Sequence, residues 1–361
     1  MRTAIVLSVV FACLLTLPYY ADSPVVVSIM PEGLSGSALL NVFLLIFLFG
    51  YLGQCWNILG GYAGQLSLGH AAYVGVGAYT STLLYVNFGV SPWIGMLAGA
   101  GLAGLFGLFV GFLSFHYRLS GPFFALATIA FAELVRLTVL HLEFTGGSLG
   151  VLIPLRGDSF WEFQFNSKEP YYYIALVMMT AVTALVYWIS RSRLGYYLHA
   201  VRQDEQAAAA IGIDTTRTKL IATTLSAALT GAGGTFYAQY TQYIVPDDLI
   251  TISLSVEIIL RTIFGGSATV LGPIVGSFIL TPLAEATRIL FASGGSGVTV
   301  VKVFASNAPA SEKFDIYLNF LANGGGGGGA IFLYGVVLIA VCVGMPHGVL
   351  PWFTKRFGAR L

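Results

Sequence analysis

The chain has 361 residues, of which 57% are hydrophobic and 9% charged, with a mean hydropathy of +0.82. A soluble domain carries about 25% charged residues because its surface must stay in water, so this composition indicates an integral membrane protein. The formal net charge of +1 gives no basic excess that would favour nucleic acid. Cys13, Cys55 and Cys342 lie in apolar runs and predict neither a disulfide framework nor a metal site.

Long apolar runs predict an all-α, polytopic transmembrane bundle. A helix needs about 20 mostly apolar residues to cross the hydrocarbon layer, where every backbone N–H must be satisfied internally. Ten candidate spans follow in chain order: 3–20, 37–60, 63–87, 93–115, 122–141, 171–190, 220–243, 250–266, 269–291 and 330–351. The third is rich in glycine and the eighth is short, so either could be re-entrant or broken. We therefore predict about 8–10 spans in a single transmembrane domain over residues 1–361.

The distribution of charge predicts that both chain ends face the cytoplasm. Loops rich in Lys and Arg lie on the cytoplasmic side, and an N-in arrangement with ten crossings collects most loop cations there and most acids opposite. Loops 142–170 and 292–329 are then external. The segment 191–219 is cytoplasmic, and its alanines predict a helix over 203–211 that stops at Gly212.

One predicted span carries a stripe of small residues at every fourth position, namely Gly95, Gly99, Ala103, Gly107 and Gly111. Small residues let two membrane helices approach backbone to backbone, so the stripe predicts a tight seam inside the protein or between subunits. The alternative is that these glycines are merely tolerated in a membrane helix.

The densest polar signal is the glycine-rich stretch 60–70, in which Gln65, Ser67 and His70 are the strong hydrogen-bonding side chains. Transporters use interrupted helices at substrate sites, because the exposed N–H groups can hold a carboxylate. The stretch therefore predicts a helix broken in mid-membrane beside a substrate pathway. The alternative is a satisfied polar patch that only pins helix packing. The glycines expected at helix breaks are Gly61, Gly64 and Gly69 here, and Gly265 and Gly266 later in the chain.

Ionisable residues inside the apolar segments form three pairs at helical spacing: Glu133 with Arg136, Glu257 with Arg261, and Glu285 with Arg288. Charges in a bilayer are costly and normally face protein or water. Glu133 and Glu257 are candidates for the pathway, with structural pairing as the alternative, and we interpret the third pair as structural.

The motifs of nucleotide hydrolysis and of common hydrolases are absent from the sequence. There is no Gly-x4-Gly-Lys-Ser/Thr loop, no Gly-x-Ser-x-Gly and no His-Glu-x-x-His. We therefore predict no catalytic residue, no metal and no cofactor on this chain. An intramembrane enzyme using Ser67 and His70 would lack a third orienting group.

The string Gly61-Tyr-Ala-Gly-Gln-Leu-Ser-Leu-Gly-His70 resembles the signature of branched-chain amino-acid ABC-transporter permeases of the LivM subunit type. Three further stretches resemble that family in the same order, at 120–128, 145–150 and 265–276. Together they extend the resemblance over about residues 37–290 and the last predicted helix.

Residues 193–213 look like the coupling helix of ABC importers, which docks on an ATP-hydrolysing subunit. The general pattern is Glu-Ala-Ala, three residues and Gly, and counting back from Gly212 puts Gln206 at the Glu position with Glu205 one earlier. The Glu role therefore stays open between them. Small residues would allow close docking and charged ones would pair at the rim; the candidates are Arg202, Glu205, Gln206, Ala207, Ala208 and Gly212. The alternative is an ordinary basic inside loop.

The resemblance implies a permease subunit of an ATP-driven importer in the bacterial inner membrane. It implies a homologous second permease, two ATP-binding subunits that carry ATP and Mg²⁺, and an extracytoplasmic protein that delivers branched-chain or other small amino acids. The alternatives are a urea or short-amide ABC permease, and a secondary transporter that is not coupled to an ATPase.

Overall fold

The computed structural model describes residues 12–20, 36–292, 335 and 348–351. Residues 12–20 are helical, which is the second half of the first predicted span. Most of the last predicted span, 330–351, and nearly all of the predicted external loop 292–329 lie outside the described residues.

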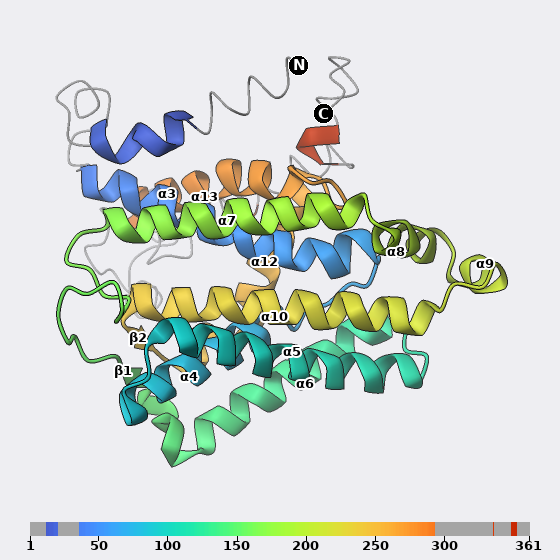
Figure 1. The fold of residues 1–361 in the computed structure, drawn as a ribbon, viewed down its shortest axis with the longest axis horizontal. Helices are drawn as coiled ribbons and strands as arrows, with labels where there is room; N and C mark the ends of the chain where they lie inside the picture. Colours follow the sequence, from blue (N-terminus) through green and yellow to red (C-terminus); the bar gives the residue numbers. More distant parts are fainter. Residues whose placement is uncertain (1–11, 21–35, 293–334, 336–347, 352–361) are drawn as a thin grey trace, which may run out of the picture.

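The described chain is a bundle of α-helices with two very short strands (Figure 1). The long helices are α3 (Gly36–Trp56), α4 (His70–Phe88), α5 (Pro92–His116), α6 (Pro122–His141), α7 (Glu169–Ser190), α10 (Thr215–Thr241) and α13 (Gly272–Ala292). The shorter helices are η1 (Asn57–Tyr62), η2 (Glu143–Thr145), η3 (Gly147–Leu149), α8 (Arg193–Gln203), α9 (Glu205–Ala210), α11 (Pro246–Leu249) and α12 (Ile252–Gly265). The strands are β1 (Val151–Leu152) and β2 (Tyr243–Ile244).

Four stretches of the described helices are long and apolar enough to cross a membrane: Gly36–Tyr62, Pro92–His116, Pro122–His141 and Glu169–Ser190. The prediction of a helical membrane bundle is therefore confirmed. The weak predicted span 250–266 corresponds to α12, whose 14 residues extend only about 21 Å at 1.5 Å per residue. That length is shorter than the roughly 30 Å hydrocarbon layer.

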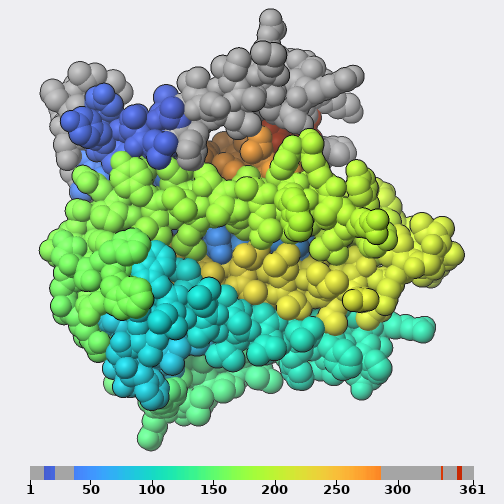
Figure 2. Space-filling view, viewed as in Figure 1, coloured from blue at the N-terminus to red at the C-terminus, as the bar shows by residue number. Residues whose placement is uncertain are grey.

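The long helices form two groups, one in the upper half and one in the lower half of the view (Figure 1). In one group, α10 packs on α4 and α5; in the other, α3 packs on α7, α12 and α13. α3 is visible between α7 and α10 in the space-filling view (Figure 2). A buried core of Leu, Ile, Phe and Tyr side chains from both groups joins them.

The small-residue stripe of α5 forms an internal seam. A Cβ atom at Gly99 would lie 2.8 Å from the carbonyl oxygen of Gly77 in α4, and one at Gly107 would lie 2.3 Å from Cβ of Ala227 in α10. Gly101 on the same helix faces the other way and has no atom within 4 Å of the corresponding point. Only residues without bulky side chains allow this approach, so the stripe determines how α4, α5 and α10 pack.

The two ends of the bundle carry different structures. α8 and α9 project from one end, and β1 and β2 lie at the opposite end (Figure 1). Val151 pairs with Ile244 in an antiparallel ladder that joins the 142–170 loop to the chain after α10. The sequence analysis predicted no strands, and a ladder of two residues per strand leaves the fold essentially all-α.

The helix predicted over 203–211 is present as α9 over Glu205–Ala210, but the prediction missed the break at Asp204. Asp204 is extended and separates α8 from α9, and its carboxylate accepts hydrogen bonds from the N–H groups of Gln206 at 2.8 Å and Ala207 at 3.0 Å. Aspartate favours this capping role over a helix interior, because its side chain satisfies N–H groups that have no partner in the helix.

Candidate functional site

The polar residues of the glycine-rich stretch form a buried cluster around His70. Its ring nitrogens lie 3.0 Å from Oγ of Ser67 and 2.9 Å from Oγ of Ser226 in α10. Ser226 uses its one hydroxyl proton to donate to the carbonyl oxygen of Cys55 at 2.7 Å. It therefore accepts from Nε2–H of His70, which leaves Nδ1 to accept from Ser67. The imidazole of α4 thus binds α10 directly and α3 through Ser226, and both of its ring nitrogens have a hydrogen-bond partner.

Aromatic rings enclose this cluster. Ser67, His70 and Ser226 have no exposed surface, and the rings of Trp56 and Tyr73 pack edge-on against His70. Trp56 also donates its Nε1–H to the carbonyl oxygen of Ser67 at 2.9 Å. In this conformation the cluster pins helix packing, and a role for it in the pathway stays a prediction.

The predicted helix break is present over residues 63–69, between η1 and α4. It runs from a contact with α8 to a contact with α6. Gly64, with φ +69°, lies against the side chain of Arg202, whereas Gly69 lies against the backbone of Thr128, six residues after α6 begins. Gln65 is buried, and its Oε1 has no hydrogen-bond partner among the described residues.

The N-terminus of α4 is already occupied by a neighbouring helix. The N–H of Ala71 donates to Oγ of Ser255 in α12 at 2.9 Å. The N–H of Leu68, just before α4, donates to Oγ1 of Thr128 at 3.0 Å. These groups were candidates for holding a carboxylate, and in this conformation protein hydroxyls take that place.

The second pair of glycines, Gly265 and Gly266, marks the reversal between α12 and α13. Gly266 has φ +123°, and a Cβ at Gly265 would lie 1.7 Å from the carbonyl oxygen of Gly272, so no larger residue fits there. Asn57 of η1 holds this turn, because its amide nitrogen donates to the carbonyl oxygen of Thr269 and its amide oxygen accepts from the N–H of Ala268, both at 2.9 Å.

Sequence reasoning did not find Asn57, and it missed two further contacts of the turn. Gln54 donates to the carbonyl oxygen of Val270, and Gly61 leaves the room that Asn57 needs. Gln54 and Asn57 are strongly polar residues in an apolar helix, which is the signal that would have found them.

Glu133 belongs to an ion-pair network on the outside of α6. Arg136 contacts Glu133 at 2.5 Å and also pairs with Asp247 of α11. The side chain of Glu133 is 45% exposed. None of its described contacts reaches the His70 cluster, and sequence reasoning did not find Asp247.

Glu257 pairs with Arg261 as the spacing predicts, at 3.1 Å. The guanidinium is buried, donates to Oγ1 of Thr281 at 3.2 Å and lies 3.8 Å from the ring centroid of Phe49. This pair therefore joins α12, α13 and α3 within the packing. The side chain of Arg288 lies outside the described part of the structure, so the third predicted pair stays untested.

The predicted coupling residues divide between exposed and buried positions on α8 and α9. Arg202, Gln206, Ala207 and Gly212 are exposed, whereas Ala208 is buried. Gly212 has φ +90°, which suits its predicted role as the helix stop. Ile211, which sequence reasoning did not single out, is 78% exposed beside these small residues.

Glu205 points back into the protein. Nζ of Lys219 in α10 donates to Oε1 of Glu205 at 2.5 Å, and Oγ1 of Thr215 donates to the same oxygen at 3.3 Å. Of the two residues that compete for the Glu role, only Gln206 is freely exposed.

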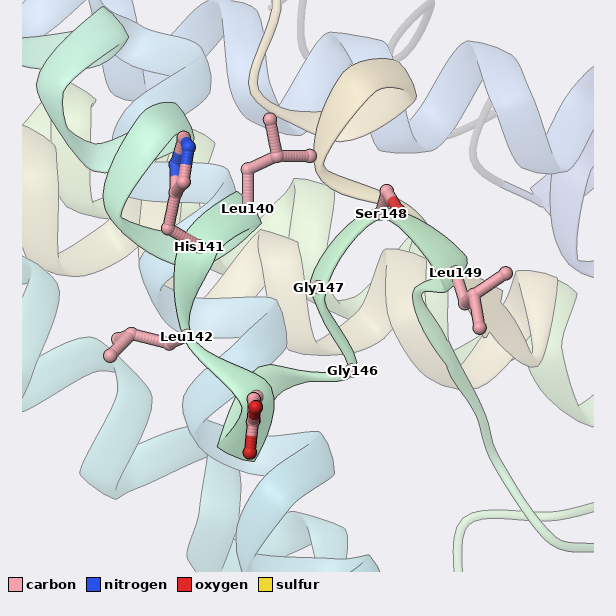
Figure 3. Close-up of a pocket in the computed structure, with 8 residues that line it drawn as sticks. Leu140, His141, Leu142, Gly146, Gly147, Ser148 and Leu149 are labelled. Atoms are coloured by element: carbon pink, nitrogen blue, oxygen red, sulfur yellow. The ribbon is translucent and has the colours of Figure 1, made fainter.

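A recess of about 340 Å³ lies at the turn that follows α6 (Figure 3). It is lined by residues 140–143 and 146–149, so it includes none of the predicted pathway residues. Figure 3 shows the side chains of His141 and Leu149 on opposite sides of the turn at Gly146 and Gly147. No group of three His, Cys, Asp or Glu side chains among the described residues could hold a metal ion.

The apolar bundle, its helix breaks and its buried polar contacts define a multi-pass helical membrane protein. The family described as branched-chain amino acid transport system / permease component matches residues 38–314. The chain belongs to this family of transport permeases. The family has the role of a permease component rather than of an enzyme.

Two curated relatives have the same description, high-affinity branched-chain amino acid transport system permease protein LivM. The one from Salmonella typhimurium is 30% identical over 262 residues, which cover 66% of this chain and 60% of the relative. The one from Escherichia coli is 28% identical over 271 residues, which cover 69% of this chain and 63% of the relative. The chain thus matches less than two thirds of the length of either relative. No solved structure is significantly similar to it.

Proposed function

We propose that this chain is the membrane-spanning permease subunit of an ATP-driven importer in the bacterial inner membrane. Its substrates are branched-chain or other small amino acids, delivered by an extracytoplasmic binding protein. A homologous second permease completes the pathway, and two ATP-binding subunits hold ATP and Mg²⁺ on the cytoplasmic side. Family membership and the names of the relatives support this proposal.

The observation that carries the proposal is the projection of α8 and α9 from one end of the bundle (Figure 2). Gln206 and Ala207 are exposed there beside Ile211, so a small protruding surface is available to a partner. A docking contact needs such a surface. Small side chains permit close approach, and covering an exposed apolar residue stabilises the complex.

The implied mechanism is alternating access. ATP binding closes the ATP-binding subunits, their motion displaces residues 193–213, and the bundle opens outward. The closed packing around His70 is then one state of the cycle, in which Ser67 and Ser226 satisfy the imidazole. Opening would need to separate α4 from α3 and α10 at this cluster.

The decisive experiment is co-purification of the full chain with a co-expressed second permease and ATP-binding subunits. ATP hydrolysis in proteoliposomes is then measured with the binding protein and, in turn, each of the twenty amino acids, urea and short amides. We expect leucine, isoleucine or valine to stimulate hydrolysis. Stimulation by urea or short amides alone would reassign the substrate. Uptake that follows an ion gradient and needs no ATP would indicate a secondary transporter and overturn the proposal.

A substitution on α9 tests the docking surface itself. We expect Ala207→Arg to abolish co-purification of the ATP-binding subunits while the permease still folds, because Ala207 is exposed. The matched control is Ser167→Arg, an exposed small residue in the loop before α7. Normal assembly and uptake of the Ala207→Arg protein would show that coupling does not occur at α9.

A further inference from the structure

The segment between α7 and α10 has three acidic residues, and each is bound within this chain. Asp204 caps α9, and Asp214 caps α10 by accepting a hydrogen bond from the N–H of Arg217 at 2.9 Å. Glu205 is paired with Lys219. Of the three, Glu205 is the one that pairs with a charged side chain of this chain, although sequence reasoning placed it among the docking residues.

Lys219 is unusual because its side chain is only 4% exposed. Lysine is almost never fully buried unless it is paired, since removing its ammonium group from water is costly. Here the ammonium donates to Glu205 at 2.5 Å and lies 4.7 Å from the ring centroid of Phe115, near the end of α5. The carboxylate and the aromatic face together replace the lost hydration.

The contacts of Lys219 extend from α9 into the bundle. Phe115 stacks on Phe124 near the start of α6, with ring centroids 5.2 Å apart. Both rings belong to a buried apolar cluster that includes Leu198 of α8 and Leu59 of η1. A displacement of the first turn of α9 therefore acts first on the buried ammonium of Lys219, then on two stacked rings, and then on the helices that pack around them.

We propose that Glu205 and Lys219 are positioning residues that form an internal latch, which fixes α9 to the ends of α10 and α5. The latch transmits the displacement of α9 to the bundle, and Glu205 acts inside this subunit rather than on the ATP-hydrolysing partner. This inference rests on the proposed function, because it assigns the route by which coupling enters the bundle.

The test uses the reconstituted complex with three readouts: co-purification of the ATP-binding subunits, ATP hydrolysis and uptake. For Glu205→Gln we expect co-purification to be retained, and hydrolysis to stay within about twofold while uptake falls by about tenfold or more, because the latch is broken but the exposed surface of α9 is intact. Glu205→Asp keeps a carboxylate facing Lys219 and should retain more of the uptake than Glu205→Gln.

A neutral double variant separates coupling from folding. Glu205→Gln with Lys219→Met leaves no buried charge unpaired, so the complex should assemble and hydrolyse ATP while uptake stays low. Arg217→Met is the matched control, because it removes an exposed cation from the same end of α10 and should leave all three readouts unchanged.

The outcomes distinguish this inference from the proposed function. Loss of the ATP-binding subunits on Glu205→Gln, with normal assembly of the unsubstituted complex, would make Glu205 a docking residue and overturn the latch alone. Full uptake by the neutral double variant would also overturn it. If the unsubstituted chain associates with no ATP-binding subunit, the proposed function fails and the latch fails with it.

Discussion

The two ends of the bundle each carry an ion pair, but the pairs differ in how far water reaches them. At the α9 end, the side chain of Lys219 is 4% exposed and that of Glu205 39%. At the opposite end, the side chain of Arg136 is 25% exposed and that of Asp247 54%. A pair in contact with water is screened and can exchange partners, whereas a buried ammonium tolerates only an arrangement that satisfies it.

This difference indicates that the two ends have different tasks. Breaking the Glu205–Lys219 contact would strand a desolvated charge, so α9 is held in one place relative to α10. Arg136 already shares its guanidinium between Glu133 and Asp247, so α11 can shift without losing every charged contact. We therefore expect α9 to keep its position relative to α10 more strictly than α11 keeps its position relative to α6.

The largest expected effect concerns the helices that connect the two ends. Gly99→Leu should prevent α5 from packing on α4, because even a Cβ would lie 2.8 Å from a backbone oxygen of Gly77. We expect the free energy of unfolding to fall by at least about 3 kcal/mol, measured as thermal stability in detergent. Gly101→Leu is the control and should be tolerated, since that position faces open space. Equal stability of the two variants would show that no rigid seam joins the ends.

The next effect concerns the cluster between the ends. His70→Leu should leave the hydroxyls of Ser67 and Ser226 without their ring partner inside the packing. We expect a loss of about 2–4 kcal/mol in the free energy of unfolding, from thermal melts of the purified protein. His70→Gln keeps donor and acceptor groups and should lose less. If His70→Leu were as stable as the parent, this cluster would not help hold α4 to α3 and α10.

The stability of Glu205→Gln directly tests the comparison between the ion pairs at the two ends. The substitution leaves the buried ammonium of Lys219 without a charged partner, and we expect a loss of about 1–3 kcal/mol after allowing for the exposure of Glu205. The loss should change little between low and high salt. A strongly salt-dependent loss would mean that the pair is open to water and resembles the pair at the other end.

The smallest effect is expected for Asp247→Asn at the opposite end. The pair with Arg136 is partly exposed and Arg136 keeps Glu133, so the free energy of unfolding should fall by less than about 1 kcal/mol. The difference from the parent should shrink further as salt is raised. A larger loss than that of Glu205→Gln would reverse the comparison between the ends.

Much of the bundle followed from the sequence, because span length and small-residue spacing are local properties. The predicted spans 93–115 and 122–141 agree within a residue with α5 and α6, and the α5 stripe lies in a seam as expected. The split at Asp204 was missed because four consecutive alanines favour helix, and the capping preference of one aspartate outweighed continuity with α8.

The polar contacts were harder to predict because they join residues that are far apart in the chain. His70 was found as a lone polar residue, but its partner Ser226 is 156 residues away. Asn57 contacts the turn at Thr269 across 212 residues, and Arg136 meets Asp247 across 111. Hydrophobic periodicity carries no information about such pairings, which depend on which helices become neighbours.

The contact between Gly64 and Arg202 joins α8 to the segment that precedes α4. Gly64 lies against the side chain of Arg202 in the last turn of α8, six residues before His70, so α8 and the segment that leads into the imidazole are in direct contact. Glycine at this point both adopts a positive φ and leaves room for Arg202. A larger residue at position 64 would have to displace the side chain of Arg202, even with every hydrogen bond around the imidazole intact.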